Sequence, residues 1–197
     1  MHLDRHLELI FRRINMKKIV LLGDSIRLIG YGAKVPELLG DQYEVWQPED
    51  NCRFASYTLR MLFDHREQIK GADVIHWNNG LWDECDLFGD GAFTPIEEYC
   101  DTMERIAKIL MTYGKTVVFA TTTPTHPAMW GQSRDRIVAY NEAVVARLSP
   151  MGIKINDLFS AIDADVERYI CGDLIHLSDE GVEVASAKVA ECIMQYA

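Results

Sequence analysis

Three residues near opposite ends of the chain have the side chains of a nucleophile, a base and an orienting acid. Ser25 ends the tripeptide Gly23-Asp24-Ser25, which directly follows an apolar run. Asp173 and His176 lie three positions apart near the C-terminus. A serine hydroxyl attacks well when an imidazole removes its proton and a carboxylate orients that imidazole. These residue types predict a serine hydrolase with Ser25 as nucleophile, His176 as base and Asp173 as orienting acid.

Short β-rich runs alternate with helical patterns along the chain, which is typical of βαβ units in a parallel sheet. Five strands are expected, over residues 18–22, 43–46, 73–77, 116–120 and 153–155. Ser25 follows the first strand and should therefore lie at the carboxyl edge of the sheet, where open parallel sheets bind ligands. The long loops 83–93 and 121–132 follow later strands and should cover the same edge.

Capping residues and apolar stripes predict the main helices. Thr94 is expected to cap one helix, with Glu97 closing a capping box and Gly114 at the helix end. Ser133 and Ser178 are expected to cap two more. Each of these helices has an apolar stripe at helical spacing, so each should bury one face against the sheet.

The composition argues against several classes of partner. The chain has 197 residues, with 48% hydrophobic and 25% charged residues and a formal net charge of −10. Nucleic acids and anionic membrane surfaces bind basic faces, so the negative charge argues against both. No apolar stretch approaches the length of a membrane span. We therefore expect a small-molecule partner and neither a nucleic acid nor a membrane.

The cysteines and the N-terminus bear on location and boundaries. The five cysteines contain no C-x-x-C pair, which argues against structural disulfides and favours a reducing, cytoplasmic environment. The N-terminal segment lacks the pattern of a secretory signal, and Met16 is a candidate natural start. We expect an N-terminal extension over residues 1–16 and one domain over residues 17–197.

The two motifs together resemble the first and last blocks of the SGNH or GDSL hydrolase family. Residues 23–25 correspond to the first block and residues 173–178 to the last, and the element order fits over roughly residues 17–196. The resemblance implies a three-layer α/β/α fold with a five-stranded parallel sheet, as in flavodoxin. It also implies a cofactor-free esterase that acts on small acyl esters, such as O-acetyl groups on carbohydrate.

The second block of the family implies part of an oxyanion hole, the group of donors that holds the developing negative charge. Residues 51–58 correspond to this block, and Ser56 occupies the position of its usual glycine. A backbone N–H survives that change. By resemblance, the backbone N–H groups of Ser25 and Ser56 would both donate to the oxyanion.

The third block departs from the family pattern. It corresponds to residues 78–83, where Trp82 occupies the position of the usual asparagine. By resemblance, Asn78 is the preferred source of the missing amide donor, because it ends a strand on the same pleat face as the block's glycine. Asn79 is the alternative donor.

Three side chains are candidates for contacts with the substrate. Asn79 lies next to the expected oxyanion donor, and Trp82 could stack on a sugar or hold an acyl group. Arg53 could bind a carboxylate or a phosphate, although a surface ion pair is the competing interpretation.

Other interpretations stay open at this stage. Ser25 could simply cap the next helix. Asp24, Asp173 and His176 could bind a divalent ion in a metal-dependent phosphoesterase, although few other ligands lie near strand ends. The change at Trp82 is also compatible with a non-catalytic binding module that has lost its oxyanion hole.

Overall fold

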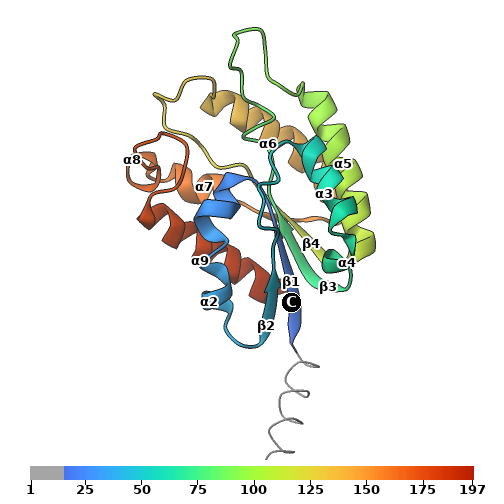
Figure 1. Cartoon of the computed structure of the whole chain (residues 1–197). Helices are drawn as coiled ribbons and strands as arrows, with labels where there is room; N and C mark the ends of the chain where they lie inside the picture. The colour runs from blue at the N-terminus through green and yellow to red at the C-terminus, as the bar shows by residue number, and fades with distance from the viewer. Residues whose placement is uncertain (1–15) are drawn as a thin grey trace, which may run out of the picture.

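The computed structural model describes residues 16–197, which form three layers around a parallel sheet (Figure 1). Its strands are β1 (Lys17–Leu22), β2 (Tyr43–Trp46), β3 (Ala72–Trp77), β4 (Gly114–Ala120) and β5 (Lys154–Asn156). They are all parallel, in the order β2-β1-β3-β4-β5. This is the flavodoxin-like order. The predicted fold class is confirmed, and the five predicted strands differ from the observed ones by at most two residues at either end.

Helices cover both faces of the sheet. One face is covered by α3 (Ala55–Asp64), α4 (Arg66–Ile69), α5 (Ile96–Tyr113) and α6 (Arg134–Leu148). The other is covered by the π-helical turn η1 (Ile26–Tyr31), α2 (Val35–Leu39), α7 (Leu158–Asp163), α8 (Val166–Tyr169) and α9 (Asp179–Tyr196). A 3-10 turn, η2 (Ser149–Met151), follows α6. The loops at the carboxyl ends of the strands gather at the top of Figure 1.

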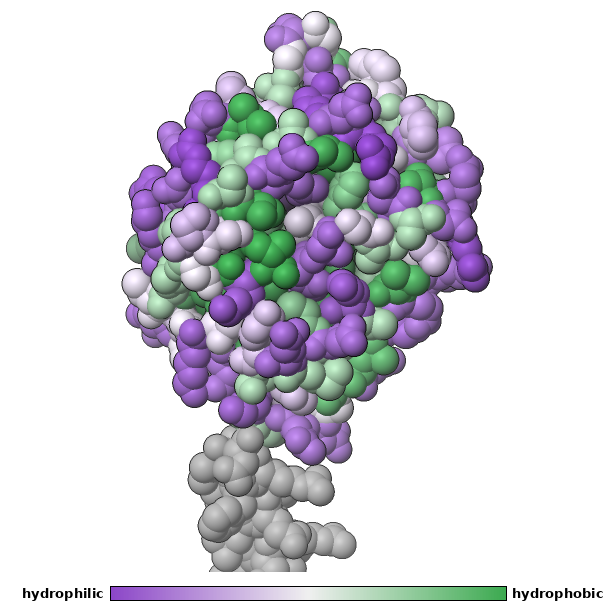
Figure 2. Space-filling view, turned by 180° about the vertical axis from the view of Figure 1, so that it is seen from behind, coloured by the Kyte–Doolittle hydropathy of each residue, from purple (hydrophilic) through white to green (hydrophobic). Residues whose placement is uncertain are grey.

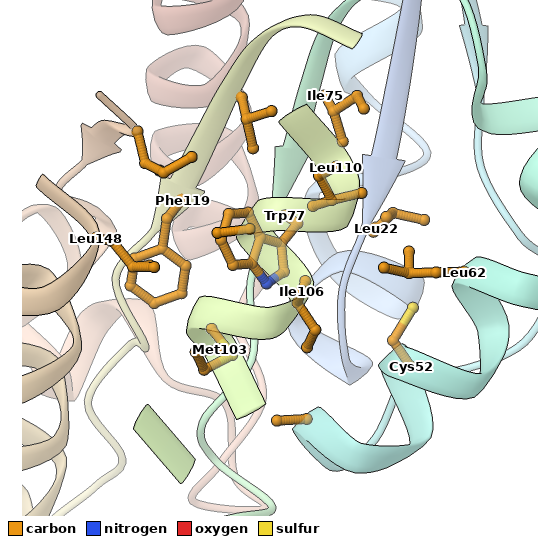
Figure 3. Close-up of a cluster of buried hydrophobic side chains, with 14 of the residues drawn as sticks. Leu22, Cys52, Leu62, Ile75, Trp77, Met103, Ile106, Leu110, Phe119 and Leu148 are labelled. Atoms are coloured by element: carbon orange, nitrogen blue, oxygen red, sulfur yellow. The ribbon is translucent and has the colours of Figure 1, made fainter. Parts of the chain in front are cut away.

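The central strands bury side chains on both faces, because successive residues of a strand point in opposite directions. In β3, Ile75 and Trp77 belong to one apolar cluster and Val74 to the other. Trp77 lies at the centre of its cluster, where its ring packs against Phe119 of β4 at a centroid distance of 5.1 Å (Figure 3). Two separate cores therefore hold the helical layers to the sheet.

Two of the predicted helix caps are confirmed. The Ser133 hydroxyl accepts a hydrogen bond from the N–H of Arg136 at the start of α6. The Ser178 hydroxyl accepts one from the N–H of Gly181 at the start of α9. Each serine satisfies one of the N–H groups that a helix leaves unpaired in its first turn.

The predicted start of α5 is wrong in detail. Thr94 does not cap this helix, because its hydroxyl donates to the buried Asp83 carboxylate at 2.9 Å. The helix begins after Pro95 with no side-chain cap. Glu97 closes no capping box and forms an ion pair with Arg147 of α6 instead. The Thr94 hydroxyl therefore binds the buried Asp83 carboxylate, whereas the local sequence pattern predicts that it binds the N-terminus of the helix.

The surface seen from behind is mainly hydrophilic, with apolar residues in patches between the polar ones (Figure 2). None of the helices within residues 16–197 combines the length and apolar character that a membrane crossing requires. Of the predicted N-terminal extension, residues 1–15 lie outside the described part of the chain.

A histidine in the sheet makes the fold sensitive to acid. His76 of β3 is fully buried, and its Nε2 lies 3.1 Å from the amide nitrogen of Asn156. Burial lowers the pKa of His76 from 6.5 to about 3. Below pH 6.5 the His76 side chain binds a proton in the unfolded chain but stays neutral in the folded protein. The free energy of unfolding therefore falls as the pH falls.

We predict that His76→Leu weakens this pH dependence. When the pH falls from 6.5 to about 5, protonation of His76 in the unfolded chain should lower the free energy of unfolding of the wild type by about 2 kcal/mol. Chemical denaturation of wild type and variant at both pH values measures the difference. The matched control, His65→Leu, removes a half-buried histidine outside the sheet. An unchanged pH dependence in His76→Leu would contradict this account.

Candidate active site

Loops from distant parts of the chain meet over the carboxyl edge of the sheet and line one cavity of about 420 Å³. Ser25, from the turn after β1, and His176, from the loop before α9, both line it. The other lining side chains are mostly apolar and come from the loops between them: Phe54, Leu81, Trp82, Cys85, Leu87, Phe93, Met129, Gln132 and Ile175. Folding therefore brings together two of the residues that the sequence singles out as catalytic.

The turn that carries Ser25 is held from below by its neighbour. Asp24 is fully buried, and its Oδ1 accepts hydrogen bonds from the Ile26 N–H and the Asn78 side-chain amide, both at 2.9 Å. Because Asp24 is turned inward, the next residue is left at the cavity. The Ser25 side chain makes no capping hydrogen bond to η1. The interpretation of Ser25 as a simple helix cap therefore does not hold.

The Asp173 carboxylate forms hydrogen bonds with both the backbone N–H and the ring of His176. Its Oδ2 lies 2.6 Å from His176 Nδ1, and its Oδ1 accepts the N–H groups of Ile175 and His176 at 3.0 and 2.8 Å. Partial burial acts to raise the pKa of Asp173, but the hydrogen bonds from His176 and Ile175 outweigh it and hold this pKa well below its usual range. An ionised Asp173 makes Nδ1 the protonated nitrogen, which leaves Nε2 as the basic one.

The two predicted backbone donors remain available. Ser56 is in the first turn of α3, where helix N–H groups lack intrahelical partners. Throughout residues 16–197, no hydrogen bond runs from the backbone N–H of Ser25 or Ser56 to another residue. The unpaired helix end also carries a partial positive charge.

Asn78 does not have its predicted place. It is 3% exposed and does not line the cavity. Its Oδ1 accepts from the Tyr31 hydroxyl at 2.7 Å, and its Nδ2 donates to Asp24. The amide is therefore engaged beneath the Ser25 turn, and its role as an oxyanion donor is corrected to that of a support for Asp24.

Asn79 is also corrected, from a substrate contact to a structural link. It is fully buried, its Nδ2 donates to the Arg53 carbonyl at 2.8 Å, and its Oδ1 accepts from the Thr58 hydroxyl at 3.0 Å. These bonds tie the second sequence block to the end of β3. The amide has no surface on which a substrate could lie.

Arg53 lies outside the cavity lining. Its guanidinium is 3.5 Å from the Asp50 carboxylate and lies over the ring of Tyr57. This agrees with the competing interpretation of a surface ion pair. Its backbone has a φ of 47°, a strained value for a side chain of this size, so the segment before α3 is held in an unusual turn.

Trp82 is the one predicted substrate contact that lines the cavity, where its ring packs edge-on against Phe54 at 5.3 Å. The next residue, Asp83, is fully buried and accepts hydrogen bonds from the Ala55 N–H and the Thr94 hydroxyl. Burial raises the pKa of Asp83 to about 7. The third block therefore anchors the start of α3 and with it Ser56.

Sequence reasoning missed two supports of the turn that carries Ser25. The Cys52 thiol accepts the Gly23 N–H at 3.2 Å, and the buried Arg27 donates to the carbonyls of Gly23, Pro48 and Asp50. A Cβ on Gly23 would lie 2.0 Å from the Asn78 side-chain oxygen, so only glycine fits there. Proximity to the Gly-Asp-Ser motif was the only sequence signal for these roles.

The residues considered for a metal do not form a metal site. Among the described residues, no group of three or more His, Cys, Asp or Glu side chains is placed to hold an ion. Asp24 lies beneath the turn with its carboxylate bound to N–H donors, while Asp173 grips His176. The described residues therefore contain no cluster of ligands of the kind that a metal-dependent phosphoesterase would need.

Comparisons with known proteins bear on the fold of the chain. No protein-family model matches the chain. A GDSL esterase/lipase of Oryza sativa subsp. japonica is 23% identical over 204 residues, which cover 89% of this chain and 77% of that protein. An acetyl xylan esterase superposes with a TM-score of 0.73 at 20% identity, covering 89% of this chain and 99% of the other. A protein of Slackia heliotrinireducens assigned to the SGNH hydrolases gives a TM-score of 0.69 at 16% identity, covering 91% and 100%.

The chain therefore has the fold of the SGNH hydrolases, and the resemblance to the SGNH/GDSL family that its first and last motifs predict is confirmed.

The support beneath Ser25 can be tested through stability. Asn78→Ala removes the partner of two buried polar groups, the Tyr31 hydroxyl and the Asp24 carboxylate. We expect a loss of about 2–6 kcal/mol in the free energy of unfolding, because each buried polar group left without a partner costs about 1–3 kcal/mol. Tyr31→Phe abandons only one group and should cost about half as much. Denaturant titration measures both, and equal stability of Asn78→Ala and wild type would refute the supporting role.

Proposed function

We propose that the protein is a serine carboxylic-ester hydrolase that works through Ser25, His176 and Asp173. The observation that carries this proposal is one cavity lined by both Ser25 and His176, with the imidazole paired at 2.6 Å to an ionised Asp173. A hydroxyl, a basic nitrogen and an orienting carboxylate are the parts that acyl transfer to serine needs.

The reaction follows from these parts. The Ser25 hydroxyl attacks the carbonyl carbon of the ester while His176 Nε2 accepts its proton. The carbonyl oxygen gains the negative charge and is held by the backbone N–H groups of Ser25 and Ser56. As the C–O bond to the alcohol breaks, the imidazolium returns the proton to that alcohol.

The acyl group then remains on Ser25. A water molecule attacks this acyl-enzyme with His176 as base, which releases the carboxylic acid and restores the serine. Asp173 keeps the ring in one orientation and stabilises its cationic form in both halves of the cycle. No step requires a metal or an organic cofactor.

The similar proteins support an ester as substrate, since one is a GDSL esterase/lipase and another is an acetyl xylan esterase. The similarity to an acetyl xylan esterase favours an O-acetyl group on carbohydrate as one substrate, which is also what the sequence resemblance implies. A fold by itself would not support this choice, because one architecture hosts many reactions.

We predict that Ser25→Ala abolishes hydrolysis of p-nitrophenyl acetate while the circular dichroism spectrum stays that of the wild type. Wild type should react with a fluorophosphonate at Ser25, because labelling requires an activated hydroxyl, and the variant should not. Ser56→Ala is the matched control and should retain activity, since only its backbone N–H is used. Full activity in Ser25→Ala would end the proposal, and an unlabelled, inactive wild type would favour a binding module.

We predict that Asp173→Asn lowers kcat by about four orders of magnitude with little change in KM, because the amide favours the wrong imidazole tautomer. Steady-state hydrolysis of p-nitrophenyl acetate measures the effect. Asp165→Asn changes an exposed aspartate that directly precedes α8 and makes no side-chain cap to it, and serves as control. Similar kcat values for the two variants would exclude Asp173 from the mechanism.

A further inference from the structure

The cavity beside Ser25 is larger and more apolar than an acetyl group requires. Its volume of about 420 Å³ is within the range of pockets that bind whole small molecules, roughly 300–1,000 Å³. Six apolar side chains form most of its wall: Phe54, Leu81, Trp82, Leu87, Phe93 and Ile175. The single methyl of an acetyl group would leave most of this wall without contact.

A row of aromatic rings continues the apolar wall to the surface. Phe54 packs edge-on against Trp82 and against Phe93, with centroids 5.3 and 5.7 Å apart. Phe93 in turn packs against Phe88 at 6.1 Å, and Phe88 is 80% exposed. An apolar chain that begins at Ser25 therefore has a continuous apolar surface along which to extend.

The wall is built by two loops that are bonded to each other. The Asp86 N–H donates to the Gly131 carbonyl at 2.6 Å, and Gln132 Nε2 donates to the Leu81 carbonyl at 2.9 Å. A Cβ on Gly131 would lie 2.6 Å from a Leu87 methyl, so the loops pack without space between them.

An ion pair locks the same two loops from behind. Arg136 of α6 pairs with the fully buried Glu84 carboxylate at 3.0 Å and also donates to the Gly131 carbonyl at 2.9 Å. The cavity is thus preformed, and a preformed apolar site binds a chain without the cost of ordering its walls.

This lining suits hydrocarbon and not a sugar. Most hydroxyls of a carbohydrate placed here would lose water without gaining a partner, because the lining has few polar atoms. Ser25 and His176 are occupied by the reaction, and Gln132 Nε2 already donates to a carbonyl, which leaves Gln132 Oε1 as a single buried acceptor without a partner among the described residues. A polar alcohol is therefore best left outside the cavity in solvent, which assigns the interior to the acyl side of the ester.

We propose that the preferred substrates carry an unbranched apolar acyl chain longer than acetyl, bound in the cavity between Ser25 and the aromatic row of Phe54, Phe93 and Phe88. This inference rests on the proposed ester hydrolase function and names its substrate class. An acetyl ester remains a substrate because it reaches the same Ser25, but it uses little of the binding surface.

The first experiment is a chain-length series of p-nitrophenyl acetate, butyrate, hexanoate and octanoate with the wild-type protein. We expect kcat/KM to rise by about fourfold for each added methylene until the cavity is filled, which corresponds to about 0.8 kcal/mol per buried CH₂. Equal rates along the series, or a preference for acetate, would overturn the inference while leaving the esterase proposal intact. Cleavage of none of these esters would instead defeat the esterase proposal itself.

The second experiment changes the wall. Phe93→Ala should lower the ratio of hexanoate to acetate kcat/KM by about tenfold, whereas Phe63→Ala, which removes a 62% exposed phenylalanine outside the cavity, should leave it unchanged. Met129→Trp narrows the cavity and should likewise favour acetate. Because each variant is judged by a ratio within one protein, a partial loss of folded enzyme does not affect the result. Equal ratios in all variants would overturn the inference.

The third experiment separates the acyl side from the alcohol side. Methyl and hexyl acetate differ only in the alcohol, and methyl acetate and methyl hexanoate only in the acyl chain. We expect the acyl series to show the larger change in kcat/KM. A larger change along the alcohol series would mean that the cavity holds the alcohol, which overturns the assignment.

Discussion

The hydrogen bond from Asn78 to Asp24 joins the end of β3 to the turn after β1, and the rest of the site depends on it. Burial raises the pKa of Asp24, while the hydrogen bonds from Asn78 and Ile26 act to lower it, so the carboxyl is held inside by specific donors. With Asp24 fixed inward, Ser25 is left at the cavity. The same contact explains why the motif begins with glycine, since any larger residue at Gly23 would collide with the Asn78 amide.

The parallel sheet solves the problem of bringing distant residues together. All five strands present their carboxyl ends to one edge, so every loop that follows a strand can contribute to one site. The last loop reaches that edge because α9 packs beside η1, the turn that begins after Ser25, with Leu177 and Ile26 in one apolar cluster. The positive φ of Leu174 then bends the loop tightly enough for Asp173 to bind both the backbone and the ring of His176.

The site divides into a polar half that supports the proposed chemistry and an apolar half that faces the substrate. In the polar half, two buried carboxyl groups hold separate segments in place: Asp83 binds the start of α3, and Glu84 pairs with Arg136 behind the loops. A buried carboxylate without a partner would be costly, so the pair of Glu84 with Arg136 also fixes the positions of the apolar loops. These contacts hold the loops that line the cavity in fixed positions, so the cavity has a defined shape.

The sequence by itself determined the strands, the caps at Ser133 and Ser178, and the two motifs, because hydrophobic periodicity, helix capping and motif spacing are local properties. The order of those motifs also indicated the resemblance to the SGNH/GDSL family. Only the tertiary structure decided what Asn78, Asn79 and Thr94 do. Each is a polar side chain whose role depends on which buried partner lies nearest in space. These partners are Asp24, Arg53 and Asp83, and each lies more than ten residues away along the chain, where local sequence patterns do not reveal it. The cavity was decided in the same way, because its wall exists only where separate loops meet.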